Sequence, residues 1–416
     1  MPDRRRWIRW SVAGLAVAGL LLSIPHLAAP APGSAPGWDG NAPSWLRGLY
    51  GSGIRIGDEA YYGLLWVAFA AYLGLAATAA YLPSRLLWVL IGAVAVAFTL
   101  SPPLLSHDVF SYISYARLGV AHGLDPYAAT PSMAPSDPVF AYVAWPHTAS
   151  VYGPLFTLLT YPLALVSVPV ALWTLKAIAG LSVLAIAWLV ARLARLRGLE
   201  PRTAAALVGL NPLVYVQVIG GAHNDALMTL LSMAGVGALL LQRGGAGGAA
   251  AVAAVSAKVP AAVFAPFAAL GSPSRRGLLL GAGVTTLAIG AATATVFHSH
   301  ALAAIGLAAQ DQASASRHSI PSTLSRLTGL PEGPIRTAAL AAYAGSLAGL
   351  LAWTARGGDW VRAAGWAVLG ALLATAWLLP WYLIWVLPLA AISRDRRLVV
   401  SVLALTALQL ANRVPV

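Results

Sequence analysis

The stretch LLWVLIGAVAVAFTLSPPLLSHDVFSY, residues 86–112, decides the fold. Residues 86–105 are predominantly apolar, and a helix of roughly 20 such residues crosses the hydrocarbon core of a bilayer. Arg85 precedes the apolar run, and Ser106-His107-Asp108 follows it. The stretch therefore predicts a membrane-spanning helix that begins at a basic turn and delivers a polar segment to the opposite face.

The composition extends this interpretation to the whole chain. Of the 416 residues, 59% are hydrophobic and only 9% are charged, whereas a soluble domain carries about 25% charged residues. The apolar segments are continuous rather than alternating, which favours helices over a β-barrel. We predict an all-α polytopic membrane protein, a single transmembrane domain over 1–416 with about 13 transmembrane helices, in a range of about 11–14.

Apolar segments separated by basic turns predict the positions of the helices. Two segments are interrupted. Residues 153–169 contain Pro162 and Pro169 and are expected to dip into the membrane and return, as broken helices do where they line a protein cavity. Residues 248–271 are expected to form a short hairpin broken at Lys258-Val259-Pro260. The other helices are expected at 10–27, 61–81, 86–105, 171–191, 203–220, 226–241, 277–297, 335–354, 363–379, 381–393 and 398–413.

The distribution of charge predicts the orientation. The net charge is +13, and most of the 26 Lys and Arg residues fall in short turns on one side, as the positive-inside rule requires of cytoplasmic loops. We predict a cytoplasmic (inner) membrane protein with its N-terminus inside and its first helix retained rather than cleaved as a signal peptide. Residues 106–152 then form the principal extracytoplasmic loop and 298–334 the second. The basic residues form no stripe with stacking aromatic residues, so nucleic-acid binding is not expected.

Asp108 is the strongest candidate for a catalytic group. It lies where a spanning helix meets the outer interface, and a carboxylate in such surroundings needs a partner or a purpose. If a helix starts there, Tyr112 and Tyr115 lie near the face of Asp108, and Arg117 follows. Asp108 is either the N-cap of this helix or a general base that deprotonates an attacking hydroxyl.

Two further motifs carry acidic residues between apolar segments. HGLDPY at 122–127 indicates a helix end at Gly followed by an Asp-Pro turn, so a turn is the stronger interpretation of Asp125 by itself. GGAHNDALM at 220–228 places His, Asn and Asp in a tight turn between two spans. Asp225 either caps the returning helix, or the turn recognises a substrate hydroxyl or supplies a second carboxylate. A metal site here lacks a spaced ligand set and is not predicted, and the absence of Cys excludes disulfides and Cys-ligated metals.

Basic and aromatic residues offer contacts for a phosphate and a sugar. Lys258 lies inside an apolar hairpin, where it either faces a cavity or snorkels to an interface. Trp381 and Tyr382 follow Pro380 and form either an interfacial aromatic belt or a stacking surface for a sugar ring. Further phosphate candidates are Arg117, Arg317 and His318.

Together these motifs resemble the actinobacterial polyprenol-phosphate-mannose-dependent α-1,6-mannosyltransferases, which are type C membrane glycosyltransferases. The resemblance covers roughly residues 60–400 and rests on DVFSY from Asp108, GLDPY to Tyr127, YGPL at 152–155, NPL at 211–213, GAHNDALM at 221–228 and PWYL at 380–383. It implies many transmembrane helices with an active site in extracytoplasmic loops, a polyprenyl-phosphate sugar as donor and a glycolipid or mannan as acceptor. It also implies that Asp108 is the acidic residue of the first catalytic loop.

These observations predict an inverting transfer of mannose in one step, with one base and no covalent intermediate. No cofactor is expected, and dependence on a divalent metal is left open. The residues predicted to bind substrate are Tyr112, Tyr115, Arg117, Asp125, Tyr127, Tyr152, His223, Asn224, Asp225, Lys258, Arg317, His318, Trp381 and Tyr382.

Two other functions remain open on the sequence. A transporter or flippase predicts paired charged or helix-breaking sites near the bilayer midplane, whereas the acidic residues here gather in the predicted outside loops. A related transferase that uses lipid-linked arabinofuranose or glucose would carry similar motifs, and the sequence does not separate these sugars. A structural scaffold gives no reason for polar clusters on one face.

Overall fold

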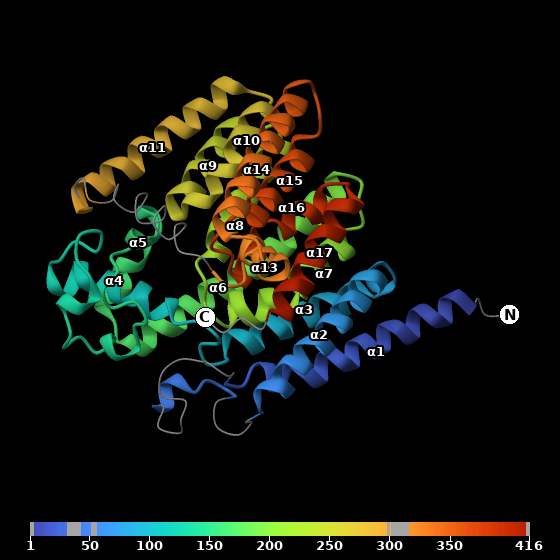
Figure 1. Ribbon diagram of the computed structural model, residues 1–416, viewed down its shortest axis with the longest axis horizontal. Coiled ribbons are helices and arrows are strands. Elements are labelled where there is room, and N and C mark those ends of the chain that lie inside the picture. Colours follow the sequence, from blue (N-terminus) through green and yellow to red (C-terminus); the bar gives the residue numbers. More distant parts are fainter. Residues whose placement is uncertain (1–3, 31–42, 51–55, 298–299, 301–315, 413–416) are drawn as a thin grey trace.

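A computed structural model describes residues 4–30, 43–50, 56–297, 300 and 316–412. Within these ranges every regular element is a helix (Figure 1), which confirms the all-α fold class. Five helices are long and apolar enough to cross a membrane. They are α1 (Arg4–Leu27), α2 (Asp58–Thr78), α6 (Val168–Leu196), α11 (Arg275–Phe297) and α14 (Glu332–Ala355). The chain is thus a helical membrane protein, and the total number of crossings stays a prediction.

Shorter helices fill the bundle between these long ones. They are α3 (Ser84–Thr99), α4 (Asp108–His122), α5 (Pro154–Thr160), α7 (Pro201–Gly209), α8 (Asp225–Leu240), α9 (Gly244–Ala257), α10 (Ala265–Gly271), α13 (Ile320–Thr328), α15 (Trp360–Ala374), α16 (Leu387–Ile392) and α17 (Arg396–Ala411). Helix α1 packs on α2, α6 packs on α7 and α8, and α9 lies between α8 and α11. Figure 1 shows α1 and α11 on opposite sides of the bundle.

Three predicted helices end earlier than expected, each near a proline. The helix predicted at 86–105 ends at Thr99, because Pro102 and Pro103 follow and cannot continue it. The helix predicted at 203–220 is divided at Asn211-Pro212 into α7 and a π-helical turn over Val214–Ile219. The helix predicted at 363–379 ends at Ala374, and Leu379 is extended before Pro380.

The chain breaks at both interrupted segments. Helix α5 gives way to a 3-10 turn over Tyr161–Leu165 before α6 begins. The second break lies at Lys258, which is extended, with φ −159° and ψ 125°, between α9 and the turn that leads to α10. The second break meets the start of α5, because the Gly153 N–H donates a hydrogen bond of 3.2 Å to the Ala257 carbonyl. The apex of the 244–271 hairpin is therefore anchored beside the start of α5.

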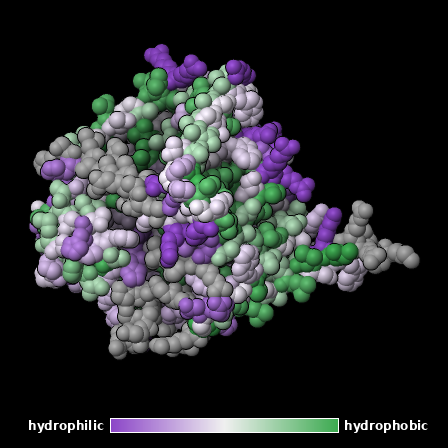
Figure 2. Space-filling view, in the orientation of Figure 1, coloured by the Kyte–Doolittle hydropathy of each residue, from purple (hydrophilic) through white to green (hydrophobic). Residues whose placement is uncertain are grey.

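The basic turns gather at one end of the bundle. Arg197 binds the Asp359 carboxylate and donates to the Ile392 carbonyl at 2.6 Å, and Arg202 donates to the Leu82 carbonyl at 2.9 Å. Figure 2 shows hydrophilic side chains at the top, along the upper right and near the centre of this face, with hydrophobic ones between them. We refer to this end as the arginine end. Helices α6, α8 and α9 connect it to the opposite end, where Tyr152 and Lys258 lie.

Candidate active site

Asp108 is the first residue of α4, where the positive end of the helix dipole favours a carboxylate. The turn before it is unusual, because Leu105 has a φ of 55°, which a side chain other than Gly adopts only at a cost. The Leu104 N–H donates to the Gly220 carbonyl at 3.1 Å. The segment that carries Asp108 is thus bound to the segment that carries the His-Asn-Asp turn.

His223 meets Asp108 across this junction. Ala222, just before it, also has a positive φ, of 56°, so two strained turns face each other. The His223 ring is buried and stacks on Trp381, with ring centroids 3.7 Å apart. Its Nδ1 lies 3.4 Å from Asp108 Oδ2. Packing therefore fixes the imidazole beside the carboxylate.

The electrostatics of this pair keep Asp108 ionised. Burial raises the pKa of the Asp108 carboxyl, but the adjoining His223 imidazole and the charges of Lys258 and His107 lower it by more. The net pKa lies below the ordinary carboxyl value, so Asp108 is a carboxylate at neutral pH. An ionised carboxylate that is still partly exposed is able to accept a proton.

Asp225 and Lys258 form a second pair beside the first. The Lys258 Nζ lies 2.7 Å from Asp225 Oδ2, and the Trp385 indole N–H donates to Asp225 Oδ1 at 2.6 Å. The Asp225 side chain is fully buried, and Asn224, not Asp225, occupies the N-cap position of α8. Asp225 therefore acts as the buried counter-ion of Lys258, and Lys258 faces a cavity, with its ammonium 5.3 Å from the Tyr382 ring centroid.

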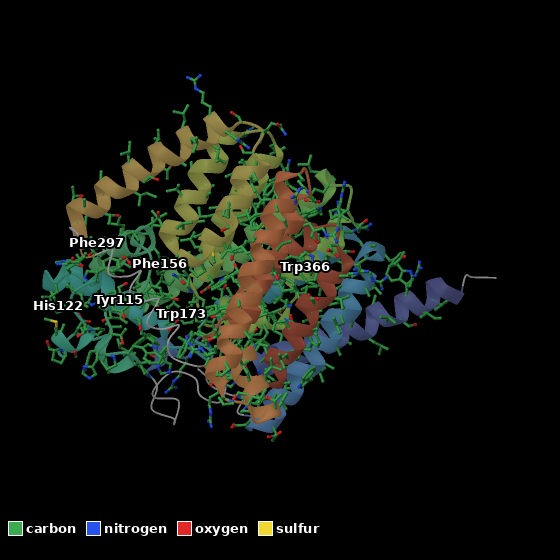
Figure 3. The ribbon with its side chains drawn as sticks, turned by 45° about the horizontal axis from the view of Figure 1, so that its top comes forward. Tyr115, His122, Phe156, Trp173, Phe297 and Trp366 are labelled. Carbon is green, nitrogen blue, oxygen red and sulfur yellow. The ribbon has the colours of Figure 1, made fainter. Side chains whose placement is uncertain are left out.

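A cavity of about 210 Å³ opens beside these groups. Residues of α4, the Tyr152 segment, the hairpin apex and the 377–382 segment line it. The polar lining includes Asp108, Ser111, Tyr115, Tyr152 and Lys258, and the aromatic lining includes Trp145, Trp377, Trp381 and Tyr382. Figure 3 shows Tyr115 of α4 near Phe156 of α5 at this end, while Trp366 of α15 lies apart from them and donates to Asp395. Carboxylate, ammonium and aromatic rings thus converge on one hollow.

Several buried polar atoms around the cavity have no hydrogen-bond partner in the described part of the chain. They are Ser111 Oγ, His223 Nε2 and both side-chain polar atoms of Asn224. Buried polar atoms are nearly always bonded in folded proteins. This concentration is typical of a site where a polar ligand or water supplies the remaining bonds.

Arg117 lies on α4 but turns away from the cavity. Its Nε donates to both oxygens of Asp137 at 2.9 Å, and His122 Nε2 lies 2.7 Å from Asp137 Oδ2. Asp137 was not singled out from the sequence, because its partners precede it by 15 and 20 residues and no local pattern links them. In this structure the three side chains hold the 106–152 loop together.

This arrangement gives a pH prediction. Burial raises the pKa of Asp137, but the hydrogen bonds from Arg117 and His122 lower it by more, leaving it below its ordinary value of 3.8. A carboxyl whose pKa is lower in the folded state than in the unfolded state stabilises the fold at pH values above its unfolded-state pKa. This stabilisation is lost as the pH falls through the folded-state pKa. We expect the unfolding midpoint of the wild type in detergent to fall more steeply than that of Asp137→Asn between about pH 5 and pH 2. Parallel curves would contradict this role.

Tyr127 and Tyr152 support the cavity wall. The Tyr127 hydroxyl donates to the Tyr152 carbonyl at 2.8 Å and lies 2.9 Å from Thr157 Oγ1. Asp125 accepts the Tyr127 N–H at 2.9 Å, as expected of an Asp-Pro turn. Its other oxygen lies 2.9 Å from His300 Nδ1. Asp125 and Tyr127 are not among the residues that line the cavity.

Tyr112 connects α4 to the His-Asn-Asp turn, since its hydroxyl oxygen accepts the Asn224 N–H at 3.4 Å. Its ring is buried edge-on against Tyr152, with centroids 4.7 Å apart. Tyr115 lines the cavity and donates its hydroxyl to the Thr148 carbonyl at 2.9 Å. Both tyrosines thus lie at the site, Tyr115 in its wall and Tyr112 behind it.

Arg317 and His318 lie beyond the wall formed by residues 377–379. Ser316 anchors them there, because its N–H donates to the Ala376 carbonyl at 2.9 Å. Burial lowers the pKa of His318, and the charges of Arg326 and Arg317 lower it further, which favours the neutral ring. Neither Arg317 nor His318 lines the cavity. Of their predicted loop, 298–334, residues 298–299 and 301–315 lie outside the described residues.

Lys176, which was not singled out from the sequence, is fully buried in α6. Its Nζ donates to the Gly220 carbonyl at 2.8 Å, and it lies 3.3 Å from the Pro102 carbonyl and 3.4 Å from Ser101 Oγ. These acceptors belong to the two segments that carry Asp108 and His223. Lys176 thus fastens both segments to α6, and a lysine inside an apolar span is the signal that identifies it.

The contact at Gly153 gives a steric prediction. A Cβ at Gly153 would lie 2.2 Å from the Ser256 carbonyl oxygen, so Gly153→Ala must push the Lys258 apex away from Tyr152. We expect a loss of about 1–3 kcal/mol of stability, as for overpacked sites, and a distorted cavity. Gly63→Ala is the control, because nothing lies within 4 Å of that Cβ. Equal unfolding midpoints for the two variants would contradict the prediction.

No group of three or more His, Asp or Glu side chains in the described ranges is arranged to hold a metal ion. The site offers instead a carboxylate beside an imidazole, an ammonium paired with a buried carboxylate, and aromatic faces. Such an arrangement is suited to proton transfer and to holding an anionic group next to a polyhydroxylated ring.

The fold and the site define a class of protein. It is an all-helical membrane protein with a polar, aromatic-walled cavity at one end of its bundle. Residues 11–272 match the family model described as alpha-(1->6)-mannopyranosyltransferase, N-terminal domain, and residues 151–411 match glycosyltransferase family 87. The chain therefore belongs to the alpha-(1->6)-mannopyranosyltransferase family, which confirms the resemblance found in its motifs.

Curated relatives are similar to this chain over part of their length. It is 32% identical over 240 residues to alpha-(1->6)-mannopyranosyltransferase A of Mycobacterium tuberculosis, covering 54% of this chain and 44% of that protein. It is 31% identical over 182 residues to alpha-(1->6)-mannopyranosyltransferase A of Corynebacterium glutamicum, covering 42% of this chain and 36% of that protein. The matches thus span less than half of these relatives. No solved structure matches the chain significantly.

Proposed function

We propose that this protein transfers mannose from a polyprenyl-phosphate-mannose donor to a mannan or glycolipid acceptor and forms an α-1,6 linkage. The observation that carries the proposal is the cavity in which the ionised Asp108, the Lys258 ammonium and the Trp381 and Tyr382 rings converge. The family membership and the names of the relatives support a mannosyl group over other sugars.

The proposed reaction is a single displacement. The acceptor hydroxyl attacks the anomeric carbon, its proton passes to Asp108, and the bond from that carbon to the phosphate oxygen breaks. The polyprenyl phosphate leaves with the bonding electrons, and Lys258 stabilises its charge. Attack opposite the leaving group inverts the configuration and needs no second nucleophilic carboxylate. Asp225, which is buried and bonded to Lys258 and Trp385, is poorly placed for such a role.

The remaining groups in the cavity suit a sugar. Aromatic faces pack against the apolar face of a sugar ring, and Trp381 is itself held in place by the stacked His223. Ser111 Oγ, without a partner in the described ranges, is available to a sugar hydroxyl. Hydrogen bonds of this kind position the ring and distinguish its hydroxyls.

The proposed setting is the inner membrane, with the N-terminus inside and the cavity facing outward. The separation of the arginine end from the cavity supports this orientation through the positive-inside rule. A donor anchored by a polyprenyl chain suits that face, because the sugar then travels with the membrane. Labelling of a cysteine introduced at Ala149 with an impermeant reagent tests the orientation, and reaction only from the cytosol would overturn it.

The proposed activity is tested with the purified full-length chain in liposomes. We expect transfer of label from polyprenyl-phosphate [14C]mannose to a short α-1,6-mannoside, with release of the product by an α-1,6-specific mannosidase. Parallel reactions contain polyprenyl-phosphate arabinofuranose or glucose. If one of these sugars is transferred and mannose is not, mannose is not the donor sugar. If intact donor lipid appears in the opposite leaflet without transfer, the result favours a flippase.

A further inference from the structure

A second, larger hollow lies at the arginine end, far from the cavity. It has a volume of about 840 Å³ and lies between the last turns of α6, the end of α8 and the start of α9. Its apolar surface includes Leu189, Leu193, Ala234, Ala238 and Ala246, and Gly237 lies among them. We refer to it as the α6–α8–α9 groove. Small residues on α8 and α9 leave space there for a chain of methylene groups.

Three arginines surround this groove. Arg192 and Arg195 lie on α6, and Arg243 directly precedes α9. All three are exposed, and within the described ranges none forms an ion pair. The groove therefore carries uncompensated positive charge beside apolar surface.

The acidic residues at this end are engaged elsewhere. Glu200 pairs with Arg202 at 2.8 Å, Asp359 pairs with Arg197, and Asp395 pairs with Arg362 at 2.7 Å. None of these carboxylates forms an ion pair with Arg192, Arg195 or Arg243, although the charge of Arg195 contributes to lowering the pKa of Glu200.

We propose that the α6–α8–α9 groove binds an anionic phospholipid. The phosphate lies among the guanidinium groups of Arg192, Arg195 and Arg243, which are suited to phosphate oxygens, and an acyl chain lies along the Ala and Gly floor. Trp188 lines the groove, with the Arg192 guanidinium 5.0 Å from its ring centroid, as is typical of a membrane interface. Basic pockets between helices on the cytoplasmic side bind anionic headgroups by this chemistry.

The site would join three helices whose far ends hold the cavity. Helix α8 begins at Asp225, α9 ends next to Lys258, and α6 carries Lys176. A lipid bound between their opposite ends would therefore stabilise the helix packing on which the cavity depends. This role concerns binding and stability, and it stands whether or not the proposed sugar transfer is correct.

The test is native mass spectrometry of the purified full-length protein with added lipid. We expect at least a tenfold preference for phosphatidylglycerol over phosphatidylcholine of equal chain length, and a rise in unfolding midpoint with phosphatidylglycerol alone. In the triple variant Arg192→Gln, Arg195→Gln, Arg243→Gln, the preference for phosphatidylglycerol over phosphatidylcholine should fall at least fivefold. Its matched control is Arg85→Gln, Arg275→Gln, Arg276→Gln, which removes equal charge from exposed turns outside the groove and should keep the preference.

Two further experiments distinguish binding of the whole lipid from binding of its phosphate group alone. Ala238→Phe narrows the floor without changing charge and should weaken phosphatidylglycerol binding, whereas glycerol phosphate, which lacks acyl chains, should not displace the lipid. Equal loss in both triple variants, displacement by glycerol phosphate, or full binding by Ala238→Phe would each overturn the proposal. Size-exclusion elution and circular dichroism identical to the wild type establish that every variant compared is folded.

Discussion

Asp108→Asn is expected to slow transfer severely while leaving the fold intact. A positioned general base contributes about 10²- to 10⁴-fold to the rate, so kcat should fall by that factor. The amide has nearly the size of the carboxylate but accepts no proton at neutral pH. Because Asp108 is proposed to act on the attacking hydroxyl, KM for the donor should change little. Initial rates of mannose transfer in liposomes measure both constants.

The matched control for this variant is Asp58→Asn. Asp58 is exposed in the first turn of α2, so the same change of charge falls at another helix start. Its kcat should stay within about twofold of the wild type. If Asp108→Asn keeps wild-type kcat, then Asp108 is not the base. If its unfolding midpoint falls along with its activity, the loss reflects misfolding, and Asp108→Glu becomes the variant that decides the role.

Lys258→Met is expected to have the largest effect on stability. It leaves the fully buried Asp225 carboxylate without its cation, although the Trp385 N–H still donates to it. Removing one partner of a buried ion pair costs about 3–5 kcal/mol. The unfolding midpoint in detergent should fall sharply, whereas Arg85→Met, at an exposed turn, should leave it nearly unchanged.

The double variant Lys258→Met, Asp225→Asn separates structure from chemistry. Neutralising Asp225 removes the unpaired charge, so much of the lost stability should return. Transfer should stay low, because the leaving phosphate still lacks its cation. Recovery of both stability and activity would show that Lys258 only stabilises the fold. A double variant no more stable than Lys258→Met would contradict the proposed pairing.

The sequence predicted features that depend on the chemistry of neighbouring residues. The helix start at Asp108, the helix end at Gly123 and the break at Lys258 each follow from residue types at adjacent positions. Gly123, for instance, has a φ of 63° and ends α4 as the HGLDPY motif predicted. The helix predicted at 203–220 was wrong in its middle, because the disruptive effect of Asn211-Pro212 was underestimated.

The contacts that the site residues make with one another could not be predicted from the sequence. Trp385 binds Asp225 although 160 positions separate them in the sequence, and Lys258 binds it from 33 positions away. Such contacts depend on the way whole helices pack. Arg117 shows the same limit, because it was a phosphate candidate as a basic residue of the predicted loop, whereas the fold directs it to Asp137. Apolar periodicity predicts where helices run, but it contains little information on which polar side chains meet.

Lys176 has a consequence for the biosynthesis of the protein. A lysine at the centre of a helix raises the cost of inserting that helix into the bilayer by roughly 2.5–3.5 kcal/mol, and by less toward the ends. Lys176 lies in the first half of α6. Two of the oxygens that bind Lys176 belong to residues 101 and 102, which are made before α6, but the nearest, on Gly220, is made later. The nascent α6 is therefore expected to remain beside the insertion channel until residue 220 has emerged, so that these spans enter the lipid as a group.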